Sequence, residues 1–219
     1  MKEGGYMNEE PEIIKISSQN ELSEVIDEIS LVLAGAFYKD PFYVYIMPDD
    51  QKRMNQLQWW FKILLKYTFA HGDLYISANK KGAALWLGPK KPAPDFIKLA
   101  FNGLIAYPFK IGLRNFWRML VVSSKWEALH KKEKDMHYYL LVIGVDPSAQ
   151  RKGLGKMLME EQLKKADEEG LFCYLETVTE ENVMFYKKAQ FYPAKTGWMG
   201  KGNPYWIMKR APEKKEIDR

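Results

Sequence analysis

The chain has 219 residues, a formal net charge of +5 and a sequence isoelectric point near 9.0. A chain of this length can bury a hydrophobic core without the help of disulfides or metal ions. Its basic character suits nucleic acid, an anionic membrane surface or an anionic cofactor, and composition does not choose among them. The lone cysteine, Cys173, cannot form an internal disulfide, so we expect a cytoplasmic protein.

No uncharged apolar run reaches the roughly 18 to 20 residues that cross a bilayer, so we expect no integral membrane association. The cations that interrupt the most hydrophobic region are Lys98, Lys110, Arg114 and Arg118. We expect a single domain over residues 1–219, with a helical insertion at 90–134. Both ends, 1–11 and 212–219, are polar or charged and are expected to be frayed.

The spacing of apolar residues and turn signals defines the elements expected in the first part of the chain. Asp40-Pro41 is interpreted as the break after the first helix. The expected elements are a strand at 12–17, a helix from Glu21 to Phe37, a helix at 49–70, and a hairpin of strands at 73–79 and 82–88.

The second part begins with a mostly helical stretch that Pro108 divides, because a proline can open a new helix. HYYLLVIGV at 137–145 is nearly apolar throughout, which predicts a strand buried on both faces. This order of strands and helices predicts an α+β fold. The later elements are expected as a helix at 152–169, a strand at 171–178, a helix at 181–190, and strands at 191–199 and 203–210.

The stretch QRKGLG at 150–155 lies between the apolar strand and the next helix. The first amides of a helix lack internal partners and attract phosphate. Gly153 and Gly155 have no side chains to keep phosphate oxygens away, and Arg151 and Lys152 add positive charge. The spacing is neither the dinucleotide fingerprint nor a P-loop. The sequence predicts a pyrophosphate cradle, with a tight strand-to-helix turn as the alternative.

Two motifs of the chain resemble those of the GNAT superfamily of acetyl-CoA-dependent N-acetyltransferases. Gln150, Gly153 and Gly155 match the Q/R-x-x-G-x-G/A loop of that family. NVMFYKKAQF, residues 182–191, resembles its N-x-x-F/L-Y-x-K-x-G-F segment. Gln190 stands where the family commonly has glycine, so the turn must use a residue with a Cβ. The resemblance implies a mixed, mostly antiparallel central sheet flanked by helices.

AFYKDPF at 36–42 and ALWLGP at 84–89 are similar to a branch of the family with a long helical insertion before the cofactor strand. The resemblance implies acetyl-CoA as the cosubstrate. It also implies that the strands diverge beside the cofactor strand and leave backbone groups free to bind pantetheine. The cofactor-binding residues expected from it are Ile143, Val145, Gln150, Arg151, Lys152, Gly153, Leu154, Gly155, Lys156 and Asn182.

Direct attack of an amine on a thioester needs a base for the amine and an acid for the departing thiolate. In the family, the Asn and Tyr of the second motif lie near the thioester. Asn182 and Tyr186 are four residues apart on the expected helix and share a face. Tyr186 is therefore predicted to be the acid. The alternatives are that Tyr186 fills the core and that Asn182 is a cap or a solvated residue.

Glu176 interrupts the apolar strand LFCYLETV, so its carboxylate would face either a cleft or an unfavourable core. It is the leading candidate for the base, with a solvated or ion-paired strand-end residue as the alternative. His137 is the second option. Cys173 is interpreted as a small buried hydrophobe. No residues have metal-ligand spacing, and we expect no metal.

Residues 95–122 combine large apolar side chains with spaced cations. One interpretation is a basic amphipathic element on a membrane surface. The preferred one is a pair of helices that pack over the sheet and wall the acceptor site. Aromatic and apolar residues at 54–61 and 96–120 could line that pocket or fill the core.

The sequence thus predicts an N-acetyltransferase that transfers the acetyl group of acetyl-CoA to a primary amine of a small molecule. The protein is expected to be a monomer or a homodimer. A coenzyme A sensor without catalysis is one alternative, and a basic nucleic-acid-binding protein is another. Acidic residues on the helix at 152–169 bring its local net charge near zero, so we expect no nucleic-acid partner.

Overall fold

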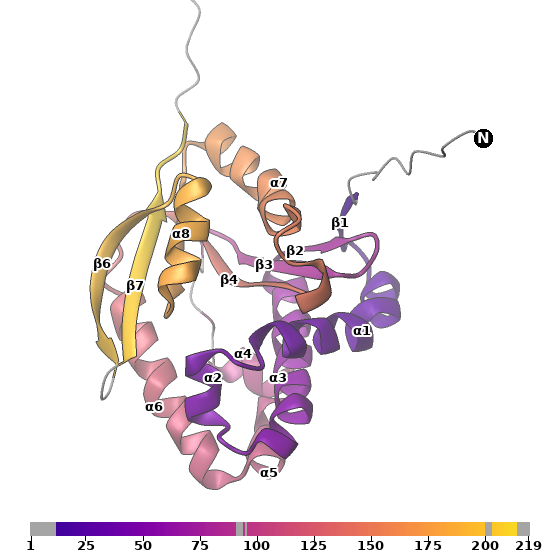
Figure 1. Cartoon of the computed structure of the whole chain (residues 1–219). Helices are drawn as coiled ribbons and strands as arrows, with labels where there is room; N and C mark the ends of the chain where they lie inside the picture. The colour runs from indigo at the N-terminus through magenta and orange to yellow at the C-terminus, as the bar shows by residue number, and fades with distance from the viewer. Residues whose placement is uncertain (1–11, 91–93, 95, 200–202, 214–219) are drawn as a thin grey trace, which may run out of the picture.

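The computed structural model describes residues 12–90, 94, 96–199 and 203–213, and they contain a seven-stranded sheet (Figure 1). The strand order is β1-β2-β3-β4-β5-β7-β6. Neighbouring strands are antiparallel except for β4 and β5, which are parallel. The predicted mixed, mostly antiparallel sheet is therefore confirmed. The strands are β1 Ile13–Lys15, β2 Gly72–Ser77, β3 Gly82–Leu87, β4 His137–Val145, β5 Phe172–Thr177, β6 Tyr192–Met199 and β7 Asn203–Arg210.

The helices flank this sheet, as expected for an α+β fold. The long ones lie close to their predicted positions, and the expectations for residues 1–11 and 214–219 lie outside the described residues. The helices are α1 Gln19–Phe37, α2 Pro41–Ile46, α3 Asp50–His71, α4 Phe96–Phe101, η1 Leu104–Ala106, α5 Tyr107–Ile111, α6 Leu113–His130, η2 Pro147–Ala149, α7 Leu154–Glu169 and α8 Glu180–Lys188.

Two details of the helices add to the prediction. Asp40-Pro41 follows the end of α1, as predicted, and it also begins the unpredicted helix α2, because the Asp40 side chain caps α2 and Pro41 is its first residue. Pro108 lies in the first turn of α5, which agrees with the prediction that it opens a new helix. The helical insertion is divided further at Gly103 and Gly112, whose φ angles are 111° and 83°. Glycine at positive φ commonly ends a helix.

Helices cover both faces of the sheet (Figure 1): α7 lies on one face, and α1 and α3 lie on the other. Alternate residues of β3 point to opposite faces of the sheet and pack in two separate hydrophobic cores. Leu85 and Leu87 pack in the core below α1 and α3, whereas Ala84 and Trp86 pack in the core of α7 and α8. This two-sided burial explains why β3 and β4 are apolar without alternation.

Helix α1 approaches β4 closely at Gly144. A Cβ at this position would lie 2.6 Å from Leu33 and 3.2 Å from Phe37, both on α1. Such a distance is far below a normal contact between carbon atoms, so the lack of a side chain at Gly144 permits the packing.

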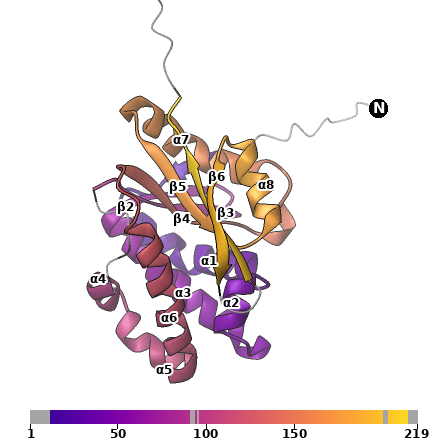
Figure 2. The same cartoon turned by 90° about the vertical axis from the view of Figure 1, so that its left-hand side faces the viewer.

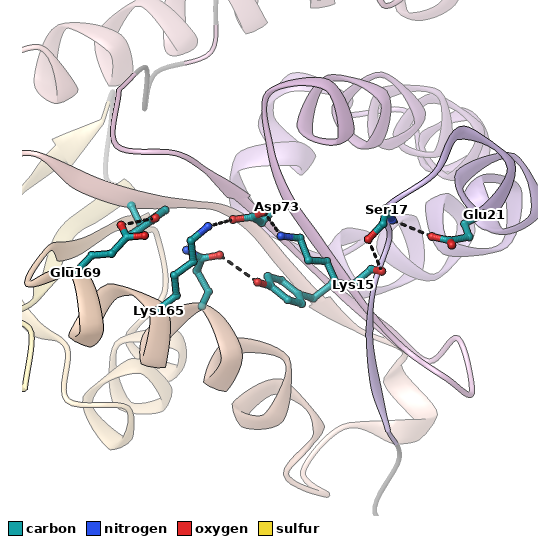
Figure 3. Close-up of polar contacts among 9 residues, drawn as sticks. Lys15, Ser17, Glu21, Asp73, Lys165 and Glu169 are labelled. Atoms are coloured by element: carbon teal, nitrogen blue, oxygen red, sulfur yellow. Dashed lines mark hydrogen bonds and ion pairs between the residues drawn. The ribbon is translucent and has the colours of Figure 1, made fainter.

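Asp73 on β2 holds α7 and β1 to the sheet through an ion-pair network (Figure 3). Its carboxylate lies 2.6 Å from Lys15 Nζ and 3.0 Å from Lys165 Nζ. The two cations lower the pKa of Asp73 against the opposing effect of burial. We call Lys15, Asp73 and Lys165 the Asp73 network.

Two hydroxyl groups extend the polar contacts between the sheet and α7 (Figure 3). Tyr75 donates to Gln162 Oε1 at 3.3 Å, and Tyr138 donates to Glu169 Oε2 at 2.7 Å. The Lys165 ammonium also lies 5.3 Å from the centre of the Tyr138 ring. These contacts fix the position of α7 on the sheet.

Candidate active site

A cleft opens where β4 and β5 separate. Strand β4 pairs with β3 from Tyr139 to Val145, but it pairs with β5 only over the register positions His137–Tyr139 and Phe172–Tyr174. The rest of β5 pairs with β7 on its other edge. Residues from both diverging strands line a cavity of about 1240 Å³.

The alternation of the β3–β4 ladder determines which backbone groups of β4 face the cleft. The Asp146 amide donates to the Lys81 carbonyl at 2.8 Å, on the β3 side. Because alternate residues of an antiparallel strand bond to opposite sides, Ile143 and Val145 present their backbone groups to the cleft. The Val145 carbonyl accepts a bond of 3.0 Å from Gln150 Nε2.

The glycine loop forms the end of the cleft next to α7. Gly153 has a φ of 86° and Arg151 has a φ of 63°, so both lie in the left-handed region. The N-terminus of α7, like those of α5 and α6, has no side-chain cap, whereas α1, α2, α3 and α8 each have one. The uncapped amides and the adjacent cations fit an anionic phosphate group.

Gly155 contributes to the loop through close packing. A Cβ at this position would lie 3.0 Å from the ring of Phe185 on α8. A Cβ at Gly153, by contrast, would meet nothing within 4 Å, so this glycine is required by its backbone angle alone. Glycine is therefore required at the two positions for different reasons: the backbone angle at Gly153 and the space next to Phe185 at Gly155.

Eleven of the twelve predicted site residues line this cavity. The exception is Lys152, whose exposed ammonium donates to the Ser148 carbonyl at 3.3 Å. The residues brought together are Ile143, Val145, Gln150, Arg151, Gly153, Leu154, Gly155, Lys156, Glu176, Asn182 and Tyr186.

Glu176 is buried at the cleft, with 7% of its side chain exposed. Burial raises its pKa to about 7, because a carboxylate loses its hydration there. The hydroxyls of Tyr139 and Tyr174 lie close enough to oppose this rise, although neither the Tyr174 hydroxyl nor Glu176 Oε1 completes a hydrogen bond. A carboxyl group with a pKa near neutrality can exchange a proton at physiological pH.

Two buried histidines lie behind Glu176. His137 Nδ1 lies 2.7 Å from the Asp135 carbonyl, which can only accept, so this nitrogen carries a proton. Its Nε2 lies 2.7 Å from His130 Nε2, and burial lowers the pKa of both rings, to about 4 for His130. In neutral His137 the Nε2 atom accepts, and His130 Nε2 therefore donates.

This tautomer leaves His130 Nδ1 as an acceptor near the carboxyl group of Glu176 but beyond hydrogen-bond distance. The two atoms, His130 Nδ1 and Glu176 Oε1, are 3.9 Å apart. His130 lines the cavity, whereas His137 does not. The sequence named His137 as a second base and missed His130, because the pairing joins the end of α6 to the start of β4 and leaves no local signal.

Tyr186 and Asn182 approach the cleft from α8. Tyr186 is buried in the core of α7 and α8, and burial raises the pKa of its hydroxyl, so it remains protonated at neutral pH. Asn182 lies one helical turn away, and its backbone amide donates to the Thr179 hydroxyl, which caps the helix. Both predictions for Tyr186, a core aromatic and a residue of the site, describe its position.

The wall of the cavity differs from the expected one. Among the described residues at 54–61 and 96–120, Trp60 and Leu99 line it, whereas Phe61 is fully buried in the core. The insertion contributes mainly through the second half of α6. The other large apolar or acidic lining residues include Phe37, Asp40, Phe42, Tyr43, Trp126, Glu127 and Glu181.

Other predicted features can be located directly. Cys173 is fully buried, and burial raises the pKa of its thiol to about 12, which fits the small hydrophobe that was predicted. Gln190 has a φ of 66°, so the turn after α8 is made by a left-handed residue with a Cβ, as predicted. No helix among the described residues is long and apolar enough to cross a bilayer.

Comparison with known proteins shows which family the chain resembles. Residues 114–191, from α6 to the end of the second motif, match the model of the Acetyltransferase (GNAT) family. Over these residues the chain is similar to the GNAT acetyltransferases. The similarity indicates an acyltransferase of the N-acetyltransferase type, and the family implies acetyl-CoA as its cosubstrate.

A GNAT relative and several solved structures are similar over most of the chain. An uncharacterized N-acetyltransferase of Schizosaccharomyces pombe is 28% identical over 191 residues, which cover 83% of this chain and 77% of the relative. The structure of histone acetyltransferase HPA2 and related acetyltransferase from Corynebacterium glutamicum has a TM-score of 0.62 at 20% identity, and the alignment covers 94% of this chain and 99% of that one.

Two solved structures of enzymes that are named for small amine substrates have the same fold as this chain. Arylalkylamine N-acetyltransferase 2 from Aedes aegypti aligns with a TM-score of 0.53 at 14% identity, over 92% of this chain and 99% of that one. A polyamine N-acetyltransferase from Drosophila melanogaster, which forms N-acetylagmatine, aligns with a TM-score of 0.55 at 12% identity, over 91% and 100%. At these identities the likeness concerns the fold.

Proposed function

We propose that this protein transfers the acetyl group of acetyl-CoA to a primary amine of a small molecule by direct attack. The observation that carries the proposal is the single cleft that joins an uncapped glycine loop, a buried carboxyl group with a pKa near 7 and a protonated phenol. The small-amine names of two structural neighbours support this choice of acceptor.

The cofactor site that we propose follows the cleft from the glycine loop to the backbone of β4. The α7 amides, with Arg151 and Lys156, would hold the pyrophosphate, and the exposed backbone groups of Ile143 and Val145 would bond the pantetheine amides. Bound acetyl-CoA would supply an activated acetyl thioester. Lys152 does not line the cavity, and its ammonium donates to the Ser148 carbonyl, so we assign no role to its side chain.

The proposed base is Glu176. An alkylamine with a pKa near 10.4 is mostly protonated at neutral pH, and its deprotonation costs about 4 to 5 kcal/mol. The Glu176 carboxylate, with a pKa of about 7, would take this proton. Neutral His130, whose Nδ1 lies 3.9 Å from Glu176 Oε1, adds no positive charge that would lower this pKa. The Tyr186 hydroxyl would give its proton to the departing thiolate.

The acceptor that we propose is a cation with an apolar part. The cavity wall combines carboxyl groups of Asp40 and Glu127 with the aromatic rings of Phe42 and Trp126. An ammonium ion is attracted by both kinds of group, through charge and through the faces of the rings. The likeness of the Aedes and Drosophila enzymes suggests arylalkylamines, polyamines and agmatine as the first compounds to test.

The cofactor assignment is tested with two variants of one residue. Gly153→Glu places a carboxylate where the phosphates would lie, whereas the control Gly153→Ala introduces the same left-handed strain without charge. We expect acetyl-CoA to stabilise the wild type and the alanine variant against thermal unfolding, by about 2.7 kcal/mol at 100 times the dissociation constant. Equal stabilisation of the folded glutamate variant would refute the cradle.

The reaction is tested by thiol release from acetyl-CoA with a panel of amines. Tyr186→Phe should retain the acetyl-CoA shift and lose turnover by about a hundredfold, the lower range for a general acid. Wild-type turnover in this variant would remove Tyr186 as the acid. An acetyl-CoA shift without thiol release for any amine would instead favour the coenzyme A sensor.

A further inference from the structure

The helical insertion exposes large apolar side chains that its own packing does not need. Six large hydrophobic side chains in the described part of the chain are more than two thirds exposed, and five of them come from α4 to α6. Their exposed fractions are 89% for Phe101, 76% for Ile105, 89% for Phe109, 76% for Leu113 and 68% for Trp117. We call these five residues the apolar face.

The insertion already has a separate buried side. Leu104, Tyr107 and Ile111 alternate with the exposed residues and lie in the core against α3. Tyr107 also donates to the Gln56 carbonyl on α3 at 3.1 Å. The elements α4, η1, α5 and α6 contact one another in turn. In Figure 2, α4, α5 and the start of α6 lie at the lower end of the molecule, away from α7 and α8. The apolar face is therefore additional to the core contacts.

The charge of the same segment has one sign up to the last turn of α6, which contains Glu127. Residues 96–126 contain five lysines and arginines and no aspartate or glutamate. Lys110 and Arg114 are exposed beside the apolar face. The nearby acids at the start of α3 are engaged locally, since Asp49 pairs with Lys52 and Asp50 pairs with Arg53. Lys110 also lies over the Trp59 ring and Arg118 over the Tyr45 ring. The elements that carry the apolar face are thus positively charged.

This combination of charge and aromatic residues indicates which kind of partner would bind the apolar face. A second copy of the chain would bring the same cations against one another, which disfavours a symmetric contact. Large aromatic and aliphatic side chains with interspersed lysine and arginine suit the interface of an anionic bilayer, where rings enter the headgroup region and cations meet lipid phosphates. Exposed apolar patches of this kind mark interaction surfaces.

We propose that the segment from α4 to α6 docks on the surface of an anionic lipid bilayer. Phe109 and Trp117 lie in the headgroup region, and Lys110, Arg114 and Arg118 contact the lipid phosphates. The protein binds peripherally. Helix α6 then has two functions along its length, because its second half lines the cleft through Trp126 and His130.

The test is sedimentation of the full chain with vesicles of phosphatidylcholine alone and of phosphatidylcholine mixed with phosphatidylglycerol. We expect binding to the anionic vesicles that decreases as salt is added. Arg114→Gln should lower the partition coefficient about fivefold, which corresponds to about 1 kcal/mol for one cation at the surface. Phe109→Ser combined with Trp117→Ser should lower it by about tenfold or more.

The matched control is Trp198→Ser, because Trp198 is 72% exposed but belongs to β6. This variant should bind vesicles like the wild type. Absence of wild-type binding to anionic vesicles at low salt would overturn the proposal, and so would equal loss of binding in the Trp198 control. A dimer in lipid-free buffer that the double substitution dissociates would also overturn it, in favour of contact between two copies.

Discussion

Asp73 and Glu176 are both acidic residues on strands of the same sheet, and their surroundings differ in kind. Asp73 has a cation on either side, and its pKa is lowered. Glu176 has no cation partner within the described residues, lies among two phenols and a neutral imidazole, and its pKa is raised to about 7. The sheet thus stabilises charge where α7 is attached and destabilises it at the cleft. Such unfavourable solvation is typical of groups that react.

The largest expected effect concerns activity. Glu176→Gln should lower kcat/KM by about 10² to 10⁴, because the amide cannot take a proton. The wild-type rate should rise as pH increases through about 7, where Glu176 loses its proton, and this rise should be absent in the variant. A pH profile of thiol release measures both. The control is Asp73→Asn, which lies outside the cavity and should keep near wild-type kcat/KM.

An unchanged profile in Glu176→Gln would exclude Glu176 as the base. It would not affect the cofactor assignment, which depends on the Gly153 variants. Acetyl-CoA should still shift the unfolding temperature of Glu176→Gln, so that a loss of turnover can be separated from a loss of cofactor binding.

The next effect concerns stability and has the opposite sign. The folded pKa of Glu176, about 7, exceeds the usual 4.5, so its favourable contribution to folding is complete below pH 4.5 and is lost as pH rises through 7. Glu176→Gln should therefore be more stable than the wild type at pH 8, on the order of 3 kcal/mol, and nearly equal to it at pH 4.5. Chemical denaturation at the two pH values measures the difference.

His130 changes stability in the other direction and must be considered in that experiment. Its folded pKa, about 4, is below the usual 6.5, so its contribution to folding is present above pH 6.5 and is lost as pH falls through 4. Because this loss affects the wild type and Glu176→Gln alike, their difference isolates the carboxyl group. A variant that is less stable than the wild type at pH 8 would contradict the unfavourable burial of Glu176.

The smallest expected effects lie in the polar contacts of α7. Asp73→Asn should destabilise the fold by about 1 to 2 kcal/mol, a value reduced for the partial exposure of Lys15 and Lys165. Tyr138→Phe removes the bond to Glu169 and should cost about 1 kcal/mol. Neither should alter the pH profile. Urea unfolding gives both numbers, and a large loss of activity in a folded Tyr138→Phe would contradict the separation of the two regions.

Local sequence signals predicted the elements and the loop well. The helix expected from Glu21 is α1, which Ser18 caps, and the glycines of QRKGLG begin α7 with left-handed backbone at Gly153. The short helix α2 was missed because Asp40-Pro41, with which it begins, was interpreted only as the end of the preceding helix. The motif also assigned Lys152 to the cofactor, but Lys152 does not line the cavity, and its ammonium donates to the Ser148 carbonyl.

What the sequence did not predict depends on contacts between distant segments. The environment of Glu176 comes from β4, β5 and α6, so its raised pKa and the His130–His137 pair have no pattern along the chain. The same limitation affected the cavity wall, where Trp126 lies outside the stretches expected to line it and Phe61 fills the core, the alternative given for its stretch. Periodicity indicates that a residue is buried but does not indicate which of two cores it enters.

The absent side chain at Gly144 affects how substitutions in this protein should be interpreted. Its neighbours Ile143 and Val145 face the cleft with their backbone, while Gly144 itself lies against α1. A methyl group there would meet Leu33 at 2.6 Å and displace the strand toward the cleft or the helix away from it. In a mutational screen, Gly144 would therefore score as a cofactor-binding position, although the cause of the defect would be a crowded helix on the other face of the sheet.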